Sequence, residues 1–313
     1  SLTKVMTLYL VFEALEAGRW RLDTPVLVSA RAADQPPTRL GLRAGQSLPL
    51  RTAISALATI SSNDVAVAVA EAHSGTETAF VAAMNRKARE IGLRRTRFVN
   101  ASGLPGTGQW TTARDMAKLA NALHARYPRY RHYFSAASVR YKGRTRGTHN
   151  GALTMVAGGN GLKTGFTCDA GYNIILGARR DGRQYFAVVL GAGTRAGRNR
   201  NAAALIRSIP SRSRIGALDT QPGPTGGPAS PPRRLTGGAC VQARLRYIRD
   251  HRQLTGWGIF LGLYIDEKRA RRSLDKTLRT LREAARTDPV LRFSRKSRAA
   301  ILPRGTPAVS YTQ

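Results

Sequence analysis

The sequence contains few cysteines and no long apolar stretch. Its 313 residues include two cysteines, Cys168 and Cys240, which would allow one disulfide in an oxidising compartment. We place them in different parts of the chain, so we expect Cys168 to be a structural thiol, although the sequence leaves its pairing with Cys240 open. No apolar stretch reaches about 18 residues, so the sequence predicts no transmembrane helix.

Acidic residues are also scarce. The chain has 51 lysines and arginines against 18 aspartates and glutamates, which gives a formal net charge of +33. Such a charge favours anionic polymers and surfaces and says nothing about the fold. The sequence has no Cys/His finger, no RNP-like aromatic segment and no evident recognition helix. We therefore expect no specific nucleic-acid partner, and an arginine-rich codon bias accounts for the charge.

The chain begins with Ser1-Leu2-Thr3-Lys4, an S-x-x-K motif. On a helix this spacing places the serine and the lysine one turn apart on the same face. A lysine kept neutral by burial or by a cationic neighbour can take a proton from the serine hydroxyl. Alone, the motif also fits a helix N-cap serine followed by a surface lysine.

Two further motifs favour the catalytic interpretation. Ser61-Ser62-Asn63 is an S-x-N, and Lys163-Thr164-Gly165 is a K-T-G. Each alone also fits a plain structural role, as a helix N-cap and as the start of a strand. Together and in this order, the three motifs are the signature of class A β-lactamases and penicillin-binding proteins.

Residues 1–207 resemble the low-molecular-mass penicillin-binding proteins, the serine D-alanyl-D-alanine carboxypeptidases of peptidase family S11. The resemblance is carried by SLTKVMTLYL at the start, SSNDVAVAVAE at Ser61–Glu71, FVNASGLPG at Phe98–Gly106, TTARDMAKLA at Thr111–Ala120 and GLKTGFT at Gly161–Thr167. It implies a β-lactamase/transpeptidase-like fold, with no cofactor and no metal. The family carries a signal peptide and its first strands ahead of this serine. We therefore expect the chain to be truncated at Ser1 and the protein to be periplasmic.

The resemblance implies the catalytic roles. Ser1 is the nucleophile, Lys4 takes its proton, and Ser61 relays a proton to the leaving amine. Asn63 orients the substrate backbone and hydrogen-bonds to Lys4. The backbone N–H groups of Ser1 and Phe166 form the oxyanion hole.

The resemblance also implies how a substrate carboxylate is bound. Lys163 supplies positive charge, which also helps to keep the catalytic lysine neutral, and Thr164 hydrogen-bonds to the carboxylate. Gly165 lets the substrate lie against the strand, because it has no Cβ. Arg198 aligns best with the arginine that grips the terminal carboxylate, with Arg195 as the alternative. We expect His73 and His149 to be surface or satisfied histidines rather than catalytic ones.

Hydrophobic patterning predicts helices followed by strands. Helices are predicted at 4–16, 52–59, 64–73, 76–90 and 111–124. Strands are predicted at 171–180 and 183–192, joined by Asp181-Gly182, which is a type I′ hairpin signal. Residues 163–167 should pair with this hairpin. The sequence thus predicts an α+β fold, an antiparallel sheet with helices packed on it.

The last third of the chain differs in composition. Residues 208–238 are rich in proline and glycine and predict a linker. Residues 239–313 would form a small α+β unit with a basic helix. Trp257, Gly262 and Tyr264 match the start of a SPOR domain, a peptidoglycan-binding module, which implies contact with glycan strands. The chain ends before the last strand of such a domain is complete, and the alternative is an unrelated βα fragment or a frameshifted end.

The resemblance implies a penicillin-sensitive enzyme that removes the terminal D-alanine of peptidoglycan stem peptides through an acyl-enzyme, with β-lactam antibiotics as covalent inhibitors. One alternative is a β-lactamase of the same fold, although no convincing E-x-x-N motif follows the S-x-N to supply a base for fast deacylation. Another is a non-catalytic protein that binds the cell wall or an anionic polymer.

Overall fold

The computed structural model describes residues 1–168 and 170–209, so the predictions for the linker beyond Ile209 and for the unit at 239–313 lie outside the described residues. The helices are α1 Lys4–Glu16, α2 Ala30–Ala33, α3 Leu50–Thr59, α4 Asn63–Ser74, α5 Glu77–Glu90, α6 Ala113–Arg126, α7 His132–Ser135 and α8 Arg195–Arg207, with 3-10 turns at Pro128–Tyr130 and Leu153–Met155. The strands are β1 Pro25–Leu27, β2 Ser47–Pro49, β3 Ser138–Tyr141, β4 Arg144–Gly147, β5 Gly159–Thr167, β6 Gly171–Arg180 and β7 Arg183–Ala192. Within these ranges no helix is both long and apolar enough to cross a membrane.

Helix α1 is the centre of the helical part. It contacts α3, α4, α5 and α6, and it is buried on nearly every side over its first eleven residues. A helix that is apolar all round is buried in a core. Phe12 stacks on Tyr130 with ring centroids 4.6 Å apart and meets the edge of Phe134 at 6.2 Å. The start of α1 is therefore held at a fixed position by the packing of its far end.

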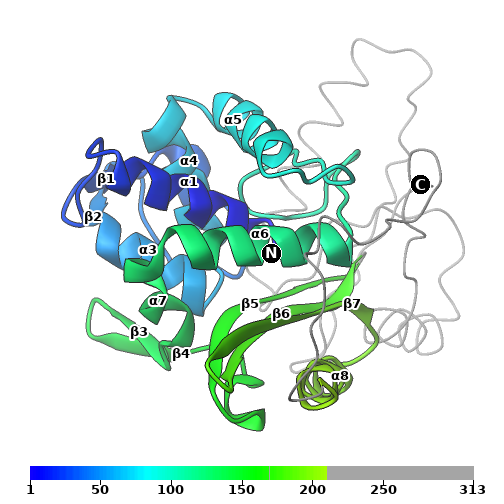
Figure 1. Cartoon of the computed structure of the whole chain (residues 1–313). Helices are drawn as coiled ribbons and strands as arrows, with labels where there is room; N and C mark the ends of the chain where they lie inside the picture. The colour runs from blue at the N-terminus through cyan, green and yellow to red at the C-terminus, as the bar shows by residue number, and fades with distance from the viewer. Residues whose placement is uncertain (169, 210–313) are drawn as a thin grey trace, which may run out of the picture. The chain divides into compact units, whose positions relative to one another are not determined.

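Strands β5, β6 and β7 form one antiparallel sheet in that order. Helices α6 and α8 lie on its opposite faces (Figure 1). Neighbouring residues of β6 divide between the two sides, as a period of two requires: Ile175 packs in the helical core, and Ile174 packs in a second cluster with Ala202 and Ile206 of α8. The turn residues Asp181 and Gly182 both have positive φ, +50° and +74°, as a type I′ turn requires.

The predicted α+β arrangement is confirmed, and most boundaries lie within two residues of the prediction. Helix α6 begins at Ala113, because Thr112 is its N-cap and accepts a hydrogen bond from the Asp115 N–H at 3.1 Å. The patterning did not reveal the two-stranded sheets β1–β2 and β3–β4, whose strands are three or four residues long. It also did not reveal α8, whose first half, residues 195–201, is polar or glycine except for Ala196.

One expectation about cysteine is wrong. Cys168 is disulfide-bonded rather than a free structural thiol. Cys240, the other cysteine of the sequence, lies outside the described residues.

The aromatic contacts of Phe12 predict a large cost of truncation. Phe12→Ala should lower the free energy of unfolding by about 3–5 kcal/mol, since it leaves a cavity among Tyr127, Tyr130 and Phe134. Chemical denaturation followed by circular dichroism measures this change. Leu205→Ala is the control, because Leu205 is 48% exposed and should change stability little. A Phe12→Ala cost below about 1 kcal/mol would contradict the packing described here.

Candidate active site

The S-x-x-K motif forms the first turn of the central helix. The N–H of Lys4 donates to the carbonyl of Ser1 at 3.2 Å, so the two side chains lie on one face of the turn. Lys4 is fully buried. Its Nζ donates to Asn63 Oδ1 at 2.7 Å and to the carbonyl of Ser102 at 2.6 Å. The lysine is therefore fixed in a core position, which rules out the surface lysine of the alternative interpretation.

Burial changes the chemistry of this lysine. Desolvation holds the pKa of Lys4 well below its usual range, and the nearby charge of Lys163 lowers it further, while Asp64 acts in the opposite direction. A lowered pKa gives a larger fraction of neutral amine near pH 7. A neutral amine next to a serine can act as a base for the hydroxyl proton.

The S-x-N motif lies at the corner between α3 and α4. Ser61 has a φ of +60°, in the left-handed region that non-glycine residues seldom adopt. Its hydroxyl is buried and has no hydrogen-bond partner among the described residues. Asn63 is the first residue of α4, and its side chain joins Lys4 to the carbonyl of Pro36, to which Nδ2 donates at 3.0 Å. A strained backbone with an unpaired buried hydroxyl is typical of functional sites.

Asp64, which the sequence interpretation did not select, holds this corner in place. Its carboxylate is fully buried. It accepts hydrogen bonds from the backbone N–H groups of Leu40, Gly41 and Leu42, at 2.9, 2.8 and 3.2 Å. It also accepts from the Ser62 hydroxyl at 2.9 Å. An acidic residue directly after the S-x-N, at the start of an apolar helix, was the signal in the sequence.

The K-T-G motif runs along β5 beside the serine. A Cβ built on Gly165 would lie 2.9 Å from the Cβ of Ser1, so any larger residue would push the strand and the serine apart. Lys163 is buried, and its Nζ donates to the carbonyl of Thr164 at 2.9 Å. Phe166 follows at the end of the motif, 40% exposed and stacked on Tyr172 with centroids 4.2 Å apart.

A row of cations continues from Lys163 toward α8. Burial lowers the pKa of Lys163 to about 7, and the charge of Arg198 contributes. Arg198 is buried in the first turn of α8, and its Nε and Nη2 donate to Asn199 Oδ1 at 2.9 and 2.7 Å. Arg195 is exposed. The charge that lowers the pKa of Lys163 is thus that of Arg198 and not that of Arg195.

His149 is exposed, as expected for a surface histidine, and it borders the same cationic region. Partial desolvation and the charges of Lys163, Arg195 and Arg198 together lower the pKa of His149 to about 4. The imidazole is consequently neutral near pH 7, and the cations of this end of the site are lysine and arginine. No sequence pattern near His149 points to this position.

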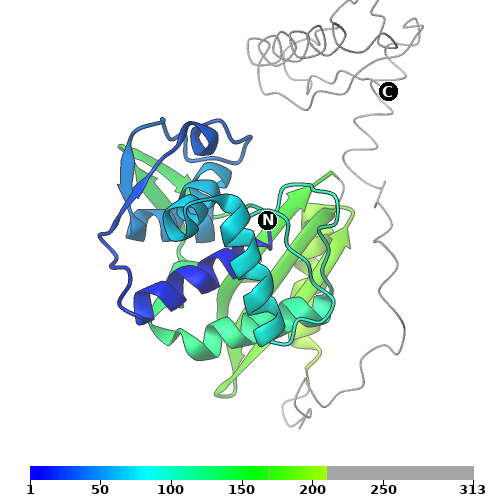
Figure 2. The same cartoon turned by 90° about the horizontal axis from the view of Figure 1, so that it is seen from above.

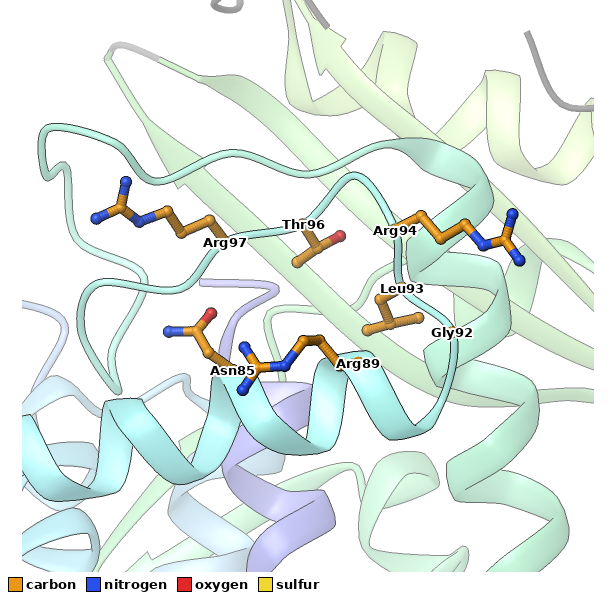
Figure 3. Close-up of a pocket in the computed structure, with 7 residues that line it drawn as sticks. All are labelled: Asn85, Arg89, Gly92, Leu93, Arg94, Thr96 and Arg97. Carbon is orange, nitrogen blue, oxygen red and sulfur yellow. The ribbon is translucent and has the colours of Figure 1, made fainter. Parts of the chain in front are cut away.

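A pocket of about 600 Å³ lies apart from these residues, between α5 and the segment that follows it (Figure 3). Three arginines line it, but Arg94 points away from Arg89 and Arg97 (Figure 3). The side-chain amide of Asn85, at the edge of the pocket, is already hydrogen-bonded to the backbone of Phe98. Its Nδ2 donates to the Phe98 carbonyl, and its Oδ1 accepts from the Phe98 N–H. The lining of the pocket holds no serine, cysteine or histidine beside a base, unlike the region where the three motifs meet.

The serine, the buried lysine, the S-x-N corner and the K-T-G strand meet in one place, as in acyl-transfer enzymes. The family model described as D-alanyl-D-alanine carboxypeptidase matches residues 1–194, which is more than half of the chain. The chain belongs to the D-alanyl-D-alanine carboxypeptidase family.

Named relatives agree with this membership. D-alanyl-D-alanine carboxypeptidase DacF of Bacillus subtilis is 33% identical over 64% of this chain and 52% of its own length. DacD of Escherichia coli is 36% identical over 66% of this chain and 55% of its own length. The chain therefore spans about half the length of these curated relatives. The part that the family model matches, residues 1–194, contains all three motifs.

Solved structures show the same fold. Penicillin binding protein 6B from Escherichia coli superposes with a TM-score of 0.62 and 36% identity, over 66% of this chain and 68% of that one. Penicillin-Binding Protein D2 from Listeria monocytogenes, in its cefotaxime-bound form, gives a TM-score of 0.61 at 31% identity, over 66% and 85% of the two chains. The predicted β-lactamase/transpeptidase-like fold is confirmed.

The row of cations predicts a pH effect. Lys163 should be charged below about pH 7 and neutral above it. If the charged form binds a substrate carboxylate, kcat/KM for a carboxylate-ended peptide falls above about pH 7. Arg198→Ala removes a charge that disfavours protonation, so the pKa of Lys163 should rise and this alkaline limb should move to higher pH. Steady-state rates over a pH series measure the limb.

Arg200→Ala is the matched control for this prediction, because Arg200 is exposed on the same helix. It should leave the limb where it is in the unaltered protein. An alkaline limb at the same pH in both variants would show that Lys163 is not the group that titrates.

Proposed function

We propose that the protein is a serine D-alanyl-D-alanine carboxypeptidase that removes the terminal D-alanine from peptidoglycan stem peptides and is acylated by β-lactam antibiotics. The observation that carries the proposal is the buried, hydrogen-bonded Lys4 with a lowered pKa, one turn from Ser1. Family membership supports the same conclusion. The catalytic part is residues 1–207, and the periplasm is the compartment in which its substrate occurs.

In the proposed reaction, Ser1 Oγ attacks the carbonyl carbon of the penultimate D-alanine and Lys4 takes its proton. General-base assistance of this kind contributes about 10²–10⁴-fold to the rate. The negative charge on the carbonyl oxygen is bound by the backbone N–H groups of Ser1 and Phe166. The C–N bond then breaks, D-alanine leaves as the amine after receiving a proton through Ser61, and water hydrolyses the ester on Ser1.

Substrate binding is proposed to use the other motif residues. Asn63 would hold the peptide backbone, while Thr164, Lys163 and Arg198 would bind the terminal carboxylate. Gly165 would leave room beside Ser1, in keeping with the 2.9 Å that a Cβ there would leave to the serine Cβ. Burial makes each cation worth more to a substrate anion than it would be in water.

The proposed nucleophile can be tested directly. In protein in which a peptide bond precedes Ser1, a fluorescent penicillin should form a persistent adduct at one equivalent, detected by gel fluorescence and intact mass. Ser1→Ala should abolish the adduct, because no other residue is expected to attack the lactam. Ser62→Ala is the control, since Ser62 hydrogen-bonds to Asp64 and should not react.

The outcomes separate the three candidate functions. A persistent adduct supports the carboxypeptidase, and rapid turnover of the drug would support a β-lactamase. No adduct with the unaltered protein would favour a binding protein without catalysis. An adduct that survives Ser1→Ala would show that the nucleophile is another residue.

The rest of the chain is proposed to tether the enzyme to its substrate. We infer that residues 208–238 are a linker and that residues 239–313, with the SPOR-like Trp257, Gly262 and Tyr264, bind glycan strands. Tethering raises the local concentration of substrate without adding a contact in the active site. The strong positive charge would strengthen binding to anionic wall polymers.

Ending the chain at Thr220 should therefore leave turnover of a small soluble peptide unchanged and lower co-sedimentation with isolated sacculi. Part of the affinity is expected to be ionic, so added salt should weaken it. Cys168→Ser in the full chain is the control, since it loses the disulfide of Cys168 and keeps residues 221–313. Sedimentation that is unchanged by the shortening would leave the fragment or frameshift interpretation of this segment.

A further inference from the structure

One face of α1 is joined to a short backbone segment, which we name the strap and define as residues 100–104. Two donors on adjacent turns of the helix bond to two consecutive strap carbonyls. The bonds are Thr7 Oγ1 to the carbonyl of Ala101 at 2.8 Å and Lys4 Nζ to that of Ser102 at 2.6 Å. The position of the strap consequently sets where the buried lysine amine lies.

The strap is rigid within itself. Asn100 Oδ1 accepts from the Gly103 N–H at 2.6 Å, and its Nδ2 donates to the carbonyl of Leu104 at 2.9 Å. Gly103 has a φ of +72°, and a Cβ there would lie 2.3 Å from the nitrogen of Ser1. The close approach of strap and serine therefore needs glycine at this position.

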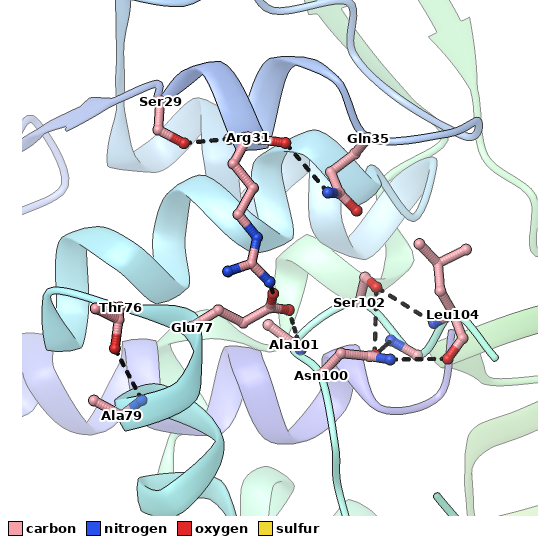
Figure 4. A network of polar contacts seen from close by, with 12 residues as sticks. Ser29, Arg31, Gln35, Thr76, Glu77, Ala79, Asn100, Ala101, Ser102 and Leu104 are labelled. Carbon is pink, nitrogen blue, oxygen red and sulfur yellow. Dashed lines mark hydrogen bonds and ion pairs between the residues drawn. The ribbon is translucent and has the colours of Figure 1, made fainter. Parts of the chain in front are cut away.

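Glu77, on α5, also binds the strap. Its Oε1 accepts from the Ala101 N–H at 2.9 Å, and its other oxygen forms an ion pair with Arg31 of α2 (Figure 4). The side chain of Glu77 is 7% exposed, whereas that of Arg31 is 59% exposed. One peptide unit, that between Ala101 and Ser102, separates the N–H bound by Glu77 from the carbonyl that accepts from Lys4.

The ordinary explanation for an acid at this position is stabilisation of a helix start. Glu77 is the first residue of α5, where negative charge is favourable. The N-cap itself is supplied by Thr76, whose side chain accepts from the Ala79 N–H at 3.1 Å. An exposed acid can stabilise a helix start equally well. Burying a carboxylate costs free energy unless the carboxylate is paired and hydrogen-bonded. The bond to the strap is the feature that this explanation leaves out.

We propose that Glu77 is a positioning residue for the active site: it fixes the strap, and through the strap the amine of Lys4 against Ser1. The proposal rests on the proposed function, in which Lys4 is the base. A displacement of about 1 Å in such a group can cost about 10²-fold in rate. Loss of Glu77 should thus affect the chemical step, while the carboxylate-binding end at Lys163 and Arg198 keeps its geometry.

Three variants in the full chain separate this role from helix stabilisation. Glu77→Ala should lower kcat for a D-Ala-D-Ala peptide by about 10- to 100-fold with KM changed less than about 2-fold. Glu77→Gln keeps an oxygen that can accept from the Ala101 N–H, and should restore most of kcat. Arg31→Ala removes the same ion pair and leaves the strap bond, so kcat should stay near that of the unaltered protein.

A second variant approaches the strap from α1. Thr7→Val keeps the shape of this buried side chain and removes its donor to Ala101, so it should also lower kcat more than it raises KM. The melting temperature of each variant shows whether it is folded. If Glu77→Ala is not folded, Glu77→Gln and Thr7→Val still decide the question.

Several outcomes would overturn the proposal. These are an unchanged kcat in folded Glu77→Ala, an equal loss in Arg31→Ala, or a loss in Thr7→Val that lies wholly in KM. Failure of the proposed function would look different. In that case the unaltered protein itself would neither cleave the peptide nor form an adduct with penicillin, whatever residue occupies position 77.

Discussion

A lysine amine held out of water beside a second lysine is the constraint on which the rest of the structure depends. Burial disfavours the ammonium of Lys4, and the charge of Lys163 disfavours it further. A neutral amine next to Ser1 is the chemical result. The arrangement persists only because the surrounding fold supplies hydrogen bonds to the amine and fixes the two lysines near each other.

Buried carboxylates supply much of that support without entering the reaction. Asp64 gathers three backbone N–H groups of the segment at 40–42 and so fixes the S-x-N corner. Glu77 binds the strap at Ala101. Both acids pair with backbone N–H groups, which offsets the cost of burying their charge. The chain has few acidic residues, and these two are buried next to the residues that accept hydrogen bonds from Lys4: Asp64 follows Asn63, and Glu77 binds Ala101 beside Ser102.

The strongly basic composition has a local counterpart at the far end of the site. Lys163 and Arg198 are both buried, and their side chains donate to the carbonyl of Thr164 and to Asn199 Oδ1. The charge of Arg198 helps to lower the pKa of Lys163, and both charges help to lower the pKa of His149. Such repulsion costs stability when the site is empty. An anionic group bound there would relieve it, and the carboxylate of the proposed substrate is such a group.

The sequence by itself determined the three motifs, the family and nearly all the longer elements, because S-x-x-K, S-x-N and K-T-G are local patterns and hydrophobic periodicity is a local signal. The short strands and the largely polar α8 carried too little of that signal. Only the tertiary structure decided that Arg198 rather than Arg195 is buried beside Lys163, that Cys168 is disulfide-bonded, and that Glu77 binds the strap. Each of these depends on contacts between residues that are distant in the chain, and the spacing of residue types does not encode them.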